Sequence, residues 1–465
     1  MKEIWTKGLK IPRFPQLDGD TSTEILVIGG GMAGVLCARE LQSRGVECLL
    51  VEGRTVGSGI TSGTTAVLST LHDPLCQDLA ARFGQEVARL YVLANWEALE
   101  KYRTLAQRYA CSWEERPHYR YAMTQAQAER LKVEAELLGS LGFAAAYHKE
   151  TPLPFPVAGA LYLPGMAQFH PLQFLYGLAS GLNIRENTPV LGISNGAAFT
   201  ERGRILARKI IVATHFPLGR FRGLYFMKLY QRRSYVIALE GGPDVEGTYA
   251  GMGASGISLR NAGNLLFLSG GRHRTGGKGS WETVRSFAAR HFPELPEGYA
   301  WANQDCMTLD GLPYVGLFSP HTPDLYVATG FGAWGMTNSM AAATLLADLV
   351  QGERKSPYAS VYTPPRLYAA APAAFQSGPH GEQFPSLNPQ TVLPHGLCPQ
   401  VEPRRSTAGT VPATGPVHGR RLGPGRTGSE PCGSELRGRT VFPICSGSTN
   451  SRWRDGAVRD GNGEI

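Results

Sequence analysis

Gly29-Gly30-Gly31-Met32-Ala33-Gly34 is the stretch that decides the predicted fold. It satisfies the pattern GxGxxG, follows the β-branched run TEILVI at 23–28, and opens a segment over 32–43 with helical character. The first glycine of such a loop permits a tight turn, the second lets the backbone approach a pyrophosphate, and the third allows helix and strand to pack closely. The helix N-terminus offers amide donors and a favourable dipole to the phosphates. The stretch predicts a dinucleotide site; for the motif alone, the alternative is a structural glycine turn.

A carboxylate after the next strand narrows the ligand. The apolar run ECLLV at 47–51 completes a βαβ unit and is followed by Glu52. A carboxylate in this place accepts hydrogen bonds from ribose hydroxyls and disfavours the 2′-phosphate of NADP. The unit therefore predicts NAD or FAD as the cofactor.

Composition and charge restrict the class of protein. The chain has 465 residues, of which 42% are hydrophobic and 18% charged, as is typical of globular proteins. Its net charge of +8 comes from scattered Lys and Arg, which indicates a solvated surface and no nucleic-acid partner. No apolar run has the length of a signal peptide or a membrane span. The eight cysteines form no CxxC pair, so we predict no disulfide framework, no metal site and a cytoplasmic location.

Secondary-structure patterns predict an interleaved α/β architecture. Asp73-Pro74 is typical of a helix start, and the helical spacing behind it continues through Leu79, Phe83 and Val87. Alternating strands follow over 225–269, with a buried strand and a small-residue helix over 324–349. We predict a Rossmann-type cofactor-binding domain at 22–75, 155–220 and 305–352, an inserted α+β substrate domain at 76–154 and 221–304, and a disordered tail at 372–465.

Further motifs occur in a characteristic order along the chain. They are GSGITS at 57–62, FHP at 169–171, KIIVATH at 209–215, DGLPYVG at 310–316 and ATGFGAWGMT at 328–337. With them the sequence resembles the FAD-dependent oxidoreductase family of D-amino acid, glycine and sarcosine oxidases, over roughly residues 22–352. Each glycine taken alone is better explained by an ordinary loop, so the order of the motifs carries the resemblance.

The resemblance implies FAD as the cofactor and a helix N-terminus aimed at the flavin pyrimidine. Such a helix end stabilises the negative charge that reduction places on the ring. The implied cofactor-binding residues are Gly29, Gly31, Met32, Ala33, Gly34, Glu52, Gly59, Thr61, Thr65, Val190, Thr214, Gly330, Gly335, Met336 and Thr337.

The sequence also resembles a bacterial branch of this family that often carries a C-terminal Rieske iron-sulfur domain. The similar stretches are 58–72, 270–276 and 304–316. A Rieske cluster needs two Cys and two His in paired groups. Cys398, Cys432 and Cys445 have no His at the required spacing, so we predict no cluster. The tail is rich in Arg and Pro and has no lysine after Lys355, which suggests a reading-frame change that resequencing would test.

The family's reaction is hydride removal from a carbon next to an amine nitrogen, so the implied substrate is a small amine or amino acid. Relatives place an arginine before the DGxPxxG turn to hold a substrate carboxylate, whereas this chain has Asn303, Gln304 and Asp305 there. Asp305 suits a cationic amine; the alternative is that it caps the turn. The electron acceptor and the oligomeric state have no signature in the sequence.

Four more residues are candidates for chemistry. Arg272 or Arg274 is a candidate anion clamp, and His273 a candidate proton shuttle, at the end of a predicted strand. The alternative is a set of exposed basic residues on a hairpin. Cys306 lies near the position of a flavin-linked cysteine in sarcosine oxidases, although the spacing differs. Rival functions are an NAD-dependent dehydrogenase and a flavin-binding protein without turnover.

Overall fold

The computed structural model describes residues 4–218, 222–352 and 356–364, all within the compact unit Met1–Gln390. The predicted disordered tail at 372–465, its three cysteines and Lys355 lie outside the described residues.

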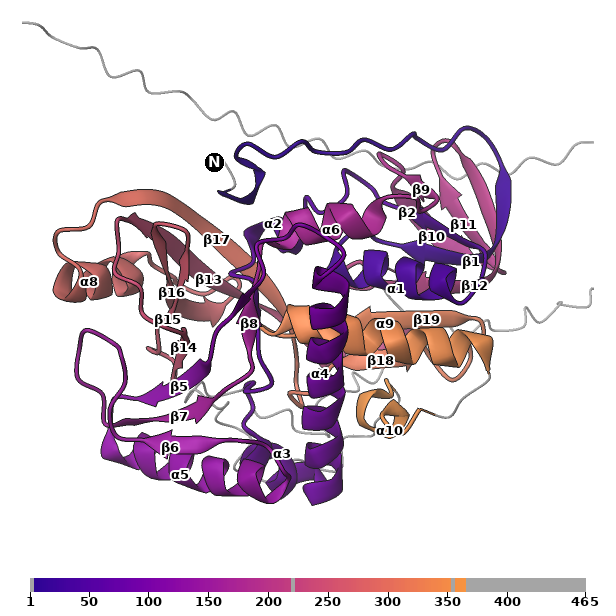
Figure 1. The fold of residues 1–465 in the computed structure, drawn as a ribbon. Helices are drawn as coiled ribbons and strands as arrows, with labels where there is room; N and C mark the ends of the chain where they lie inside the picture. Colours follow the sequence, from indigo (N-terminus) through magenta and orange to yellow (C-terminus); the bar gives the residue numbers. More distant parts are fainter. Residues whose placement is uncertain (1–3, 219–221, 353–355, 365–465) are drawn as a thin grey trace, which may run out of the picture. The chain divides into compact units, whose positions relative to one another are not determined.

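The glycine loop follows β1 (Thr21–Ile28), a strand in the interior of the first sheet (Figure 1). The strands of this sheet are β1, β2 (Cys48–Val51), β9 (Ile184–Arg185), β10 (Val190–Ser194), β11 (Ala197–Thr200), β12 (Gly203–Val212), β18 (Tyr314–Leu317) and β19 (Leu325–Thr329). They run in the order β10-β11-β12-β1-β2-β9, with β19 against β12 and β18 against β19. β1 is parallel to both β2 and β12. Residues 25–28 are all buried, as expected for a parallel strand covered on both faces.

Two helices pack side by side against this sheet, α1 (Met32–Ser43) and α9 (Gly335–Gln351), as Figure 1 shows. Gly34 makes the contact between α1 and β1 possible. A Cβ on Gly34 would lie 1.8 Å from the carbonyl oxygen of Gly29, far inside van der Waals contact. Only a residue without a side chain allows the helix to begin this close to the strand.

The second sheet is mainly antiparallel and draws on two separate stretches of chain. Its order is β17-β13-β16-β15-β14-β5-β7-β6, and β14 pairs with β5 in parallel. The helix α8 (Glu282–His291) packs against it. The strands are β5 (His118–Ala122), β6 (Ala146–His148), β7 (Gly159–Leu163), β13 (Leu229–Glu240), β14 (Thr248–Gly251), β15 (Ser258–Ala262), β16 (Leu265–Arg274) and β17 (Glu297–Thr308).

A small third sheet and seven more α-helices complete the described part of the chain. A three-stranded sheet joins β3 (Val67–Leu68), β8 (Ala167–Gln168) and β4 (Glu114–Glu115). The remaining helices are α2 (Ile60–Gly63), α3 (Cys76–Phe83), α4 (Gln85–Ala106), α5 (Gln125–Ser140), α6 (Pro171–Ala179), α7 (Tyr225–Lys228) and α10 (Ala359–Tyr362). The domain boundaries expected from the sequence stay a prediction.

The predicted helix start at Asp73-Pro74 is wrong. α3 begins at Cys76, and its first N–H groups are capped by the buried Glu134 of α5, at 2.6 Å from Cys76 N and 2.9 Å from Gln77 N. The predicted continuous helix also breaks at Gly84, which has φ +89. Asp73 instead forms a salt bridge with the buried Arg120 at 2.6 Å, because a buried guanidinium needs a carboxylate partner.

We expect Gly34→Ala to lower the free energy of unfolding by at least about 3 kcal/mol, because its Cβ would drive α1 off the strand. Gly139→Ala on α5 is the matched control, since its Cβ would meet nothing within 4 Å. That control should leave stability equal or raise it by about 0.5–1 kcal/mol. Urea unfolding followed by circular dichroism measures both; equal midpoints would contradict the proposed role of the contact.

Candidate active site

A cavity of about 750 Å³ takes its lining from both sheets and from the glycine loop. On the side of the first sheet, the lining includes the loop after β1, residues 213–215 after β12 and the start of α9. The inner face of the second sheet contributes residues of β13, β14, β15, β16, β17 and β5. The cavity therefore joins the predicted cofactor loop to the predicted substrate domain.

The loop end of the cavity is built to receive a polar, negatively charged group. Gly31 is the N-cap of α1 and has no side chain with which to cap the helix. Glu52 is held in place by two backbone N–H groups, from Gly30 at 2.7 Å and from Arg54 at 2.8 Å. Thr61 accepts a hydrogen bond from Met32 N at 3.1 Å and so ties the second glycine segment to the first.

A second helix N-terminus reaches the same cavity. α9 begins at Gly335 after Trp334, again without a side-chain cap. Its first turn leaves N–H groups available to an acceptor inside the cavity.

The structure brings most of the predicted cofactor residues together. Those that line the cavity are Gly29, Gly31, Met32, Ala33, Glu52, Gly59, Thr61, Thr65, Val190, Thr214, Gly335 and Met336. Gly34, Gly330 and Thr337 lie behind this surface. Gly330 has φ +74 and sits where a Cβ would contact Thr308 at 2.3 Å, and Thr337 Oγ1 lies 3.2 Å from His72 Nε2.

Arg272 projects from β16 at the substrate-domain side of the cavity. Its side chain is 10% exposed, and its Nη2 donates to Ser258 Oγ at 3.2 Å. Nη1 lies 4.0 Å from Asp73 Oδ2 and has no hydrogen-bond partner among the described residues. Burial, and then the charge of Arg232, lower the pKa of Arg272 to about 10, so the guanidinium is charged at neutral pH.

Asp305 also lines the cavity, from within β17. Its register partner is Arg232 on β13. The alternative that Asp305 caps a turn is wrong, because the residue lies inside a strand. Burial raises the pKa of Asp305 to about 6, against the opposing effects of Arg232 and Arg272.

Three other candidates lie outside the cavity lining. His273 stacks on Tyr235, with 5.7 Å between ring centroids, and the exposed Arg274 lies 5.4 Å from the Tyr230 ring. Cys306 is buried in the core of the first sheet, with Sγ 3.6 Å from Thr329 Oγ1. Burial raises the pKa of the Cys306 thiol to about 11, which disfavours the reactive thiolate.

Sequence reasoning missed His118 and Arg120 on β5. Both are buried, and His118 lines the cavity. The available signal was two polar residues spaced by two in an otherwise aromatic and apolar strand, HYRYA at 118–122. That spacing places both side chains on one face of a sheet.

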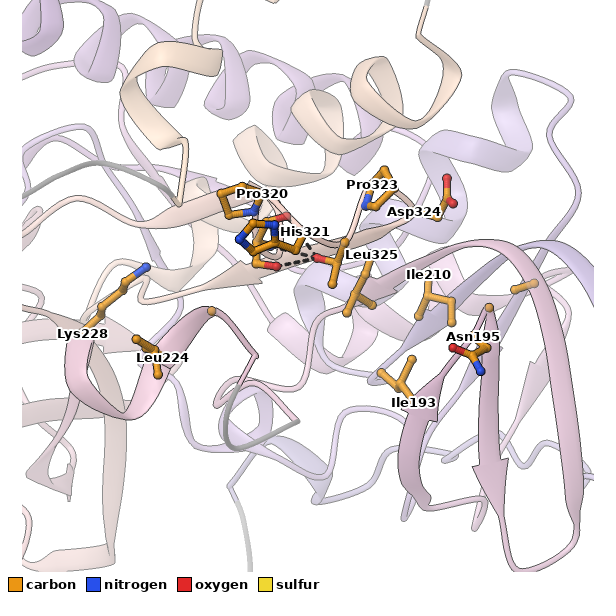
Figure 2. A pocket seen from close by; sticks show the side chains of 15 residues that line it. Ile193, Asn195, Ile210, Leu224, Lys228, Pro320, His321, Pro323, Asp324 and Leu325 are labelled. Carbon is orange, nitrogen blue, oxygen red and sulfur yellow. Dashed lines mark hydrogen bonds between the residues drawn. The ribbon is translucent and has the colours of Figure 1, made fainter. Parts of the chain in front are cut away.

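Figure 2 shows a second cavity of about 870 Å³, between the β10–β12 strands and the segment 319–325. Its walls include Ile193, Ile210 and Leu325. None of the glycine-loop residues lines it, so we do not assign the active site to it.

Within 4–218, 222–352 and 356–364, no three His, Cys, Asp or Glu side chains gather as metal ligands. Among the helices of that same part, none is long and apolar enough to cross a membrane.

The fold and the glycine loop together define a dinucleotide-binding oxidoreductase. Residues 24–349 match the family DAO, described as FAD dependent oxidoreductase. The chain belongs to this family and is an FAD-dependent oxidoreductase, which excludes the NAD-dependent dehydrogenase. The predicted cofactor and fold class are confirmed.

Relatives and solved structures agree with this assignment. The chain is 35% identical over 386 residues to the Bacillus subtilis protein YhfW, whose name refers to a Rieske 2Fe-2S iron-sulfur protein, covering 78% of this chain and 75% of that one. Glycine oxidase from Geobacillus kaustophilus is similar in structure, with TM-score 0.64, 20% identity and coverage of 74% and 99%. L-proline dehydrogenase from P. horikoshii has TM-score 0.62, 20% identity and coverage of 76% and 98%.

The cavity fits FAD on its own features. The start of α1, where only Met32 N has a side-chain partner among the described residues, suits the pyrophosphate, and Glu52 beside it suits ribose hydroxyls. The uncapped start of α9 suits a ring that gains negative charge on reduction.

We expect the flavin to be non-covalent, because Cys306 does not line the cavity. Acid precipitation of the purified yellow protein should leave the colour in the supernatant, and Cys306→Ala should behave in the same way. Colour that stays with the wild-type pellet, and is lost from it in the variant, would show a covalent bond to Cys306.

Proposed function

We propose that this enzyme oxidises an α-amino acid whose carboxylate binds Arg272. The observation that carries the proposal is the buried Nη1 of Arg272, which has no hydrogen-bond partner among the described residues and belongs to a residue that lines the cavity. A carboxylate accepts charge-assisted hydrogen bonds from a guanidinium in a planar, specific geometry. The anion clamp thus comes from β16, instead of the stretch before the DGxPxxG turn.

The charges around the cavity support an anionic substrate group. Arg120 is already paired with Asp73, through bonds of 2.6 and 3.1 Å. Arg232 faces Asp305 across the strand pair. Three arginines and two aspartates leave one positive charge in excess, and Arg272 is the one of these arginines that lines the cavity. Asp73 lies 4.0 Å from its Nη1 and is already hydrogen-bonded to Arg120. A carboxylate bound at Arg272 balances the excess charge.

Asp305 suits the amine end of the same substrate. Its carboxylate attracts an ammonium group, and a pKa of about 6 lets it take up a proton near neutral pH. The uncharged amine then has the lone pair that hydride loss from the adjacent carbon requires. Bound FAD supplies the hydride acceptor. Phe331 and Trp334 add apolar surface to the lining, which helps to exclude water from the substrate.

The names of the similar structures support this substrate class, since glycine oxidase and L-proline dehydrogenase are named for amino acids. A simple amine is the second candidate, favoured by the carboxylate of Asp305. We also keep a cytoplasmic location as a prediction.

Anaerobic flavin reduction separates the two candidates. Glycine is compared with methylamine, and L-proline with pyrrolidine, which are the same molecules without the carboxylate. Amino acids should bleach the flavin and the matched amines should not. The reverse result would establish the amine candidate. A flavin that no compound in a panel of amines and D- and L-amino acids reduces would mean binding without turnover.

Arg272→Met should lower kcat/KM for the best amino acid by about 30-fold or more, because losing one side of a buried charge pair costs about 2–5 kcal/mol. Arg274→Met should change it less than about 2-fold, since that side chain is exposed and outside the cavity lining. Stopped-flow flavin reduction measures both. Equal losses in the two variants would refute the assignment of the clamp to Arg272.

The pKa of about 6 for Asp305 predicts a pH dependence. Above this pH the side chain is a carboxylate, so kcat/KM should be highest there and fall as pH drops through about 6. Asp305→Asn should have a lower kcat/KM without that inflection. A pH profile of flavin reduction from 5 to 8 tests this, and an unchanged inflection in the variant would assign it to another group.

A further inference from the structure

His118 presents a buried acceptor for which the described residues provide no partner. The residue lies on β5, is 2% exposed, and lines the cavity described above. Its Nε2 makes no hydrogen bond within the described residues. Buried polar atoms in native proteins nearly always have a partner, so an orphan in a ligand cavity points to a group that arrives with the ligand.

The hydrogen bonds around the ring favour one tautomer of His118. Nδ1 lies 2.8 Å from Thr248 Oγ1, and the carbonyl oxygen of Pro117 is a second partner for the Thr248 hydroxyl, at 3.4 Å. When the hydroxyl donates to Pro117, its oxygen accepts from Nδ1–H, and Nε2 keeps its lone pair.

The charges facing the ring keep it neutral. Burial, then Arg120 on the same strand and His72 from the segment after β3, lower the pKa of His118 well below its usual range, with Asp73 opposing them. Trp334, at the start of α9, packs edge-on against the ring at 5.7 Å. A neutral Nε2 accepts from a donor, but the nearby Arg120 disfavours a second cation.

The strand order places His118 and Asp305 on opposite sides of Arg272. Asp305 is on β17, two strands from β16 in one direction, and His118 is on β5, three strands away in the other. Three strand spacings amount to roughly 14 Å between backbones. The long Arg272 side chain shortens this span by reaching Ser258 on the neighbouring β15. A small ligand held by Arg272 can therefore extend one group towards each flank.

We propose that His118 Nε2 accepts a hydrogen bond from an uncharged donor, an amide or a hydroxyl, on the side chain of the substrate. This inference rests on the proposed function, because Arg272 must hold the carboxylate and Asp305 the amine. His118 then selects, among amino acids, those with a neutral polar side chain over apolar ones of the same shape.

Near-isosteric pairs of amino acids test the proposal on the FAD-loaded enzyme. Threonine with valine and asparagine with leucine are compared as both enantiomers, by anaerobic flavin reduction. The wild type should prefer the donor-bearing member by at least about 10-fold in kcat/KM, because a site built to bond a donor rejects the analogue that lacks it. If a water molecule satisfies Nε2 instead, the members of each pair will react equally and the proposal is overturned.

His118→Asn is the decisive variant, because its amide keeps a donor beside Thr248 but has no atom in the place of Nε2. The preference should fall to within about 2-fold, through loss of the donor-bearing substrate alone. His118→Gln, which restores an acceptor near Nε2, should recover part of it. His148→Asn on β6 is the matched control, since His148 stacks on Tyr162 and does not line the cavity. A preference that persists in His118→Asn overturns the proposal.

Thr248→Val is a second variant that tests the same proposal if His118→Asn does not fold. Without the Thr248 hydroxyl the ring proton is free to move to Nε2, so the preference should fall here as well; an unchanged preference would contradict the proposal. Failure of the proposed function has a different result. If no amino acid reduces the wild-type flavin, both proposals fail; if valine and threonine reduce it equally well, only the role of His118 fails.

Discussion

The contact between Gly34 and the Gly29 carbonyl is the constraint on which the cofactor end of the molecule depends. It lets α1 start directly at the end of β1, so the N-terminus of that helix lines the cavity. The same loop organises its surroundings, because Gly30 N bonds Glu52 and Gly30 O accepts from Gly57 N at 2.9 Å. α9 packs on α1, which places a second helix N-terminus beside the first cavity wall. The positions of the α1 and α9 N-termini at the cavity therefore both depend on the close contact between Gly34 and the Gly29 carbonyl.

The sequence predicted the cofactor end well because its signals are local. A glycine pattern, a strand and a terminal carboxylate follow one another closely in the chain. Gly31, Glu52 and Thr61 all belong to this short stretch, and all three line the cavity. The substrate end could not be predicted in the same way. Asp73, Arg120 and Arg272 lie far apart in the chain and meet only because β5 and β16 belong to one sheet. Asp73-Pro74 has the local pattern of a helix start, and only the buried Arg120 explains why its carboxylate is used elsewhere.

The second sheet lines the cavity with polar side chains that come from several of its strands. Asp305, Arg272 and His118 come from three strands, and small residues such as Ser258 lie between them. Asp73 contacts two arginines of this face, Arg120 at 2.6 Å and Arg272 at 4.0 Å, without lining the cavity itself. In the proposed function, the register of these strands decides which side chains meet the substrate.

The interleaving of the two sheets also has a consequence for biosynthesis. The glycine loop is among the first segments to leave the ribosome, yet β1 needs β12, and β12 needs β19 at Leu325–Thr329. In the second sheet β5 likewise waits for its later partner β14, and the far edge waits for β17. Most of the chain must be synthesised before either sheet can close, and pairings of such long sequence separation form slowly. The apolar strand at 23–28 therefore lacks its β12 partner until residue 212 is made, and the cofactor cavity lacks the start of α9 until residue 335 follows.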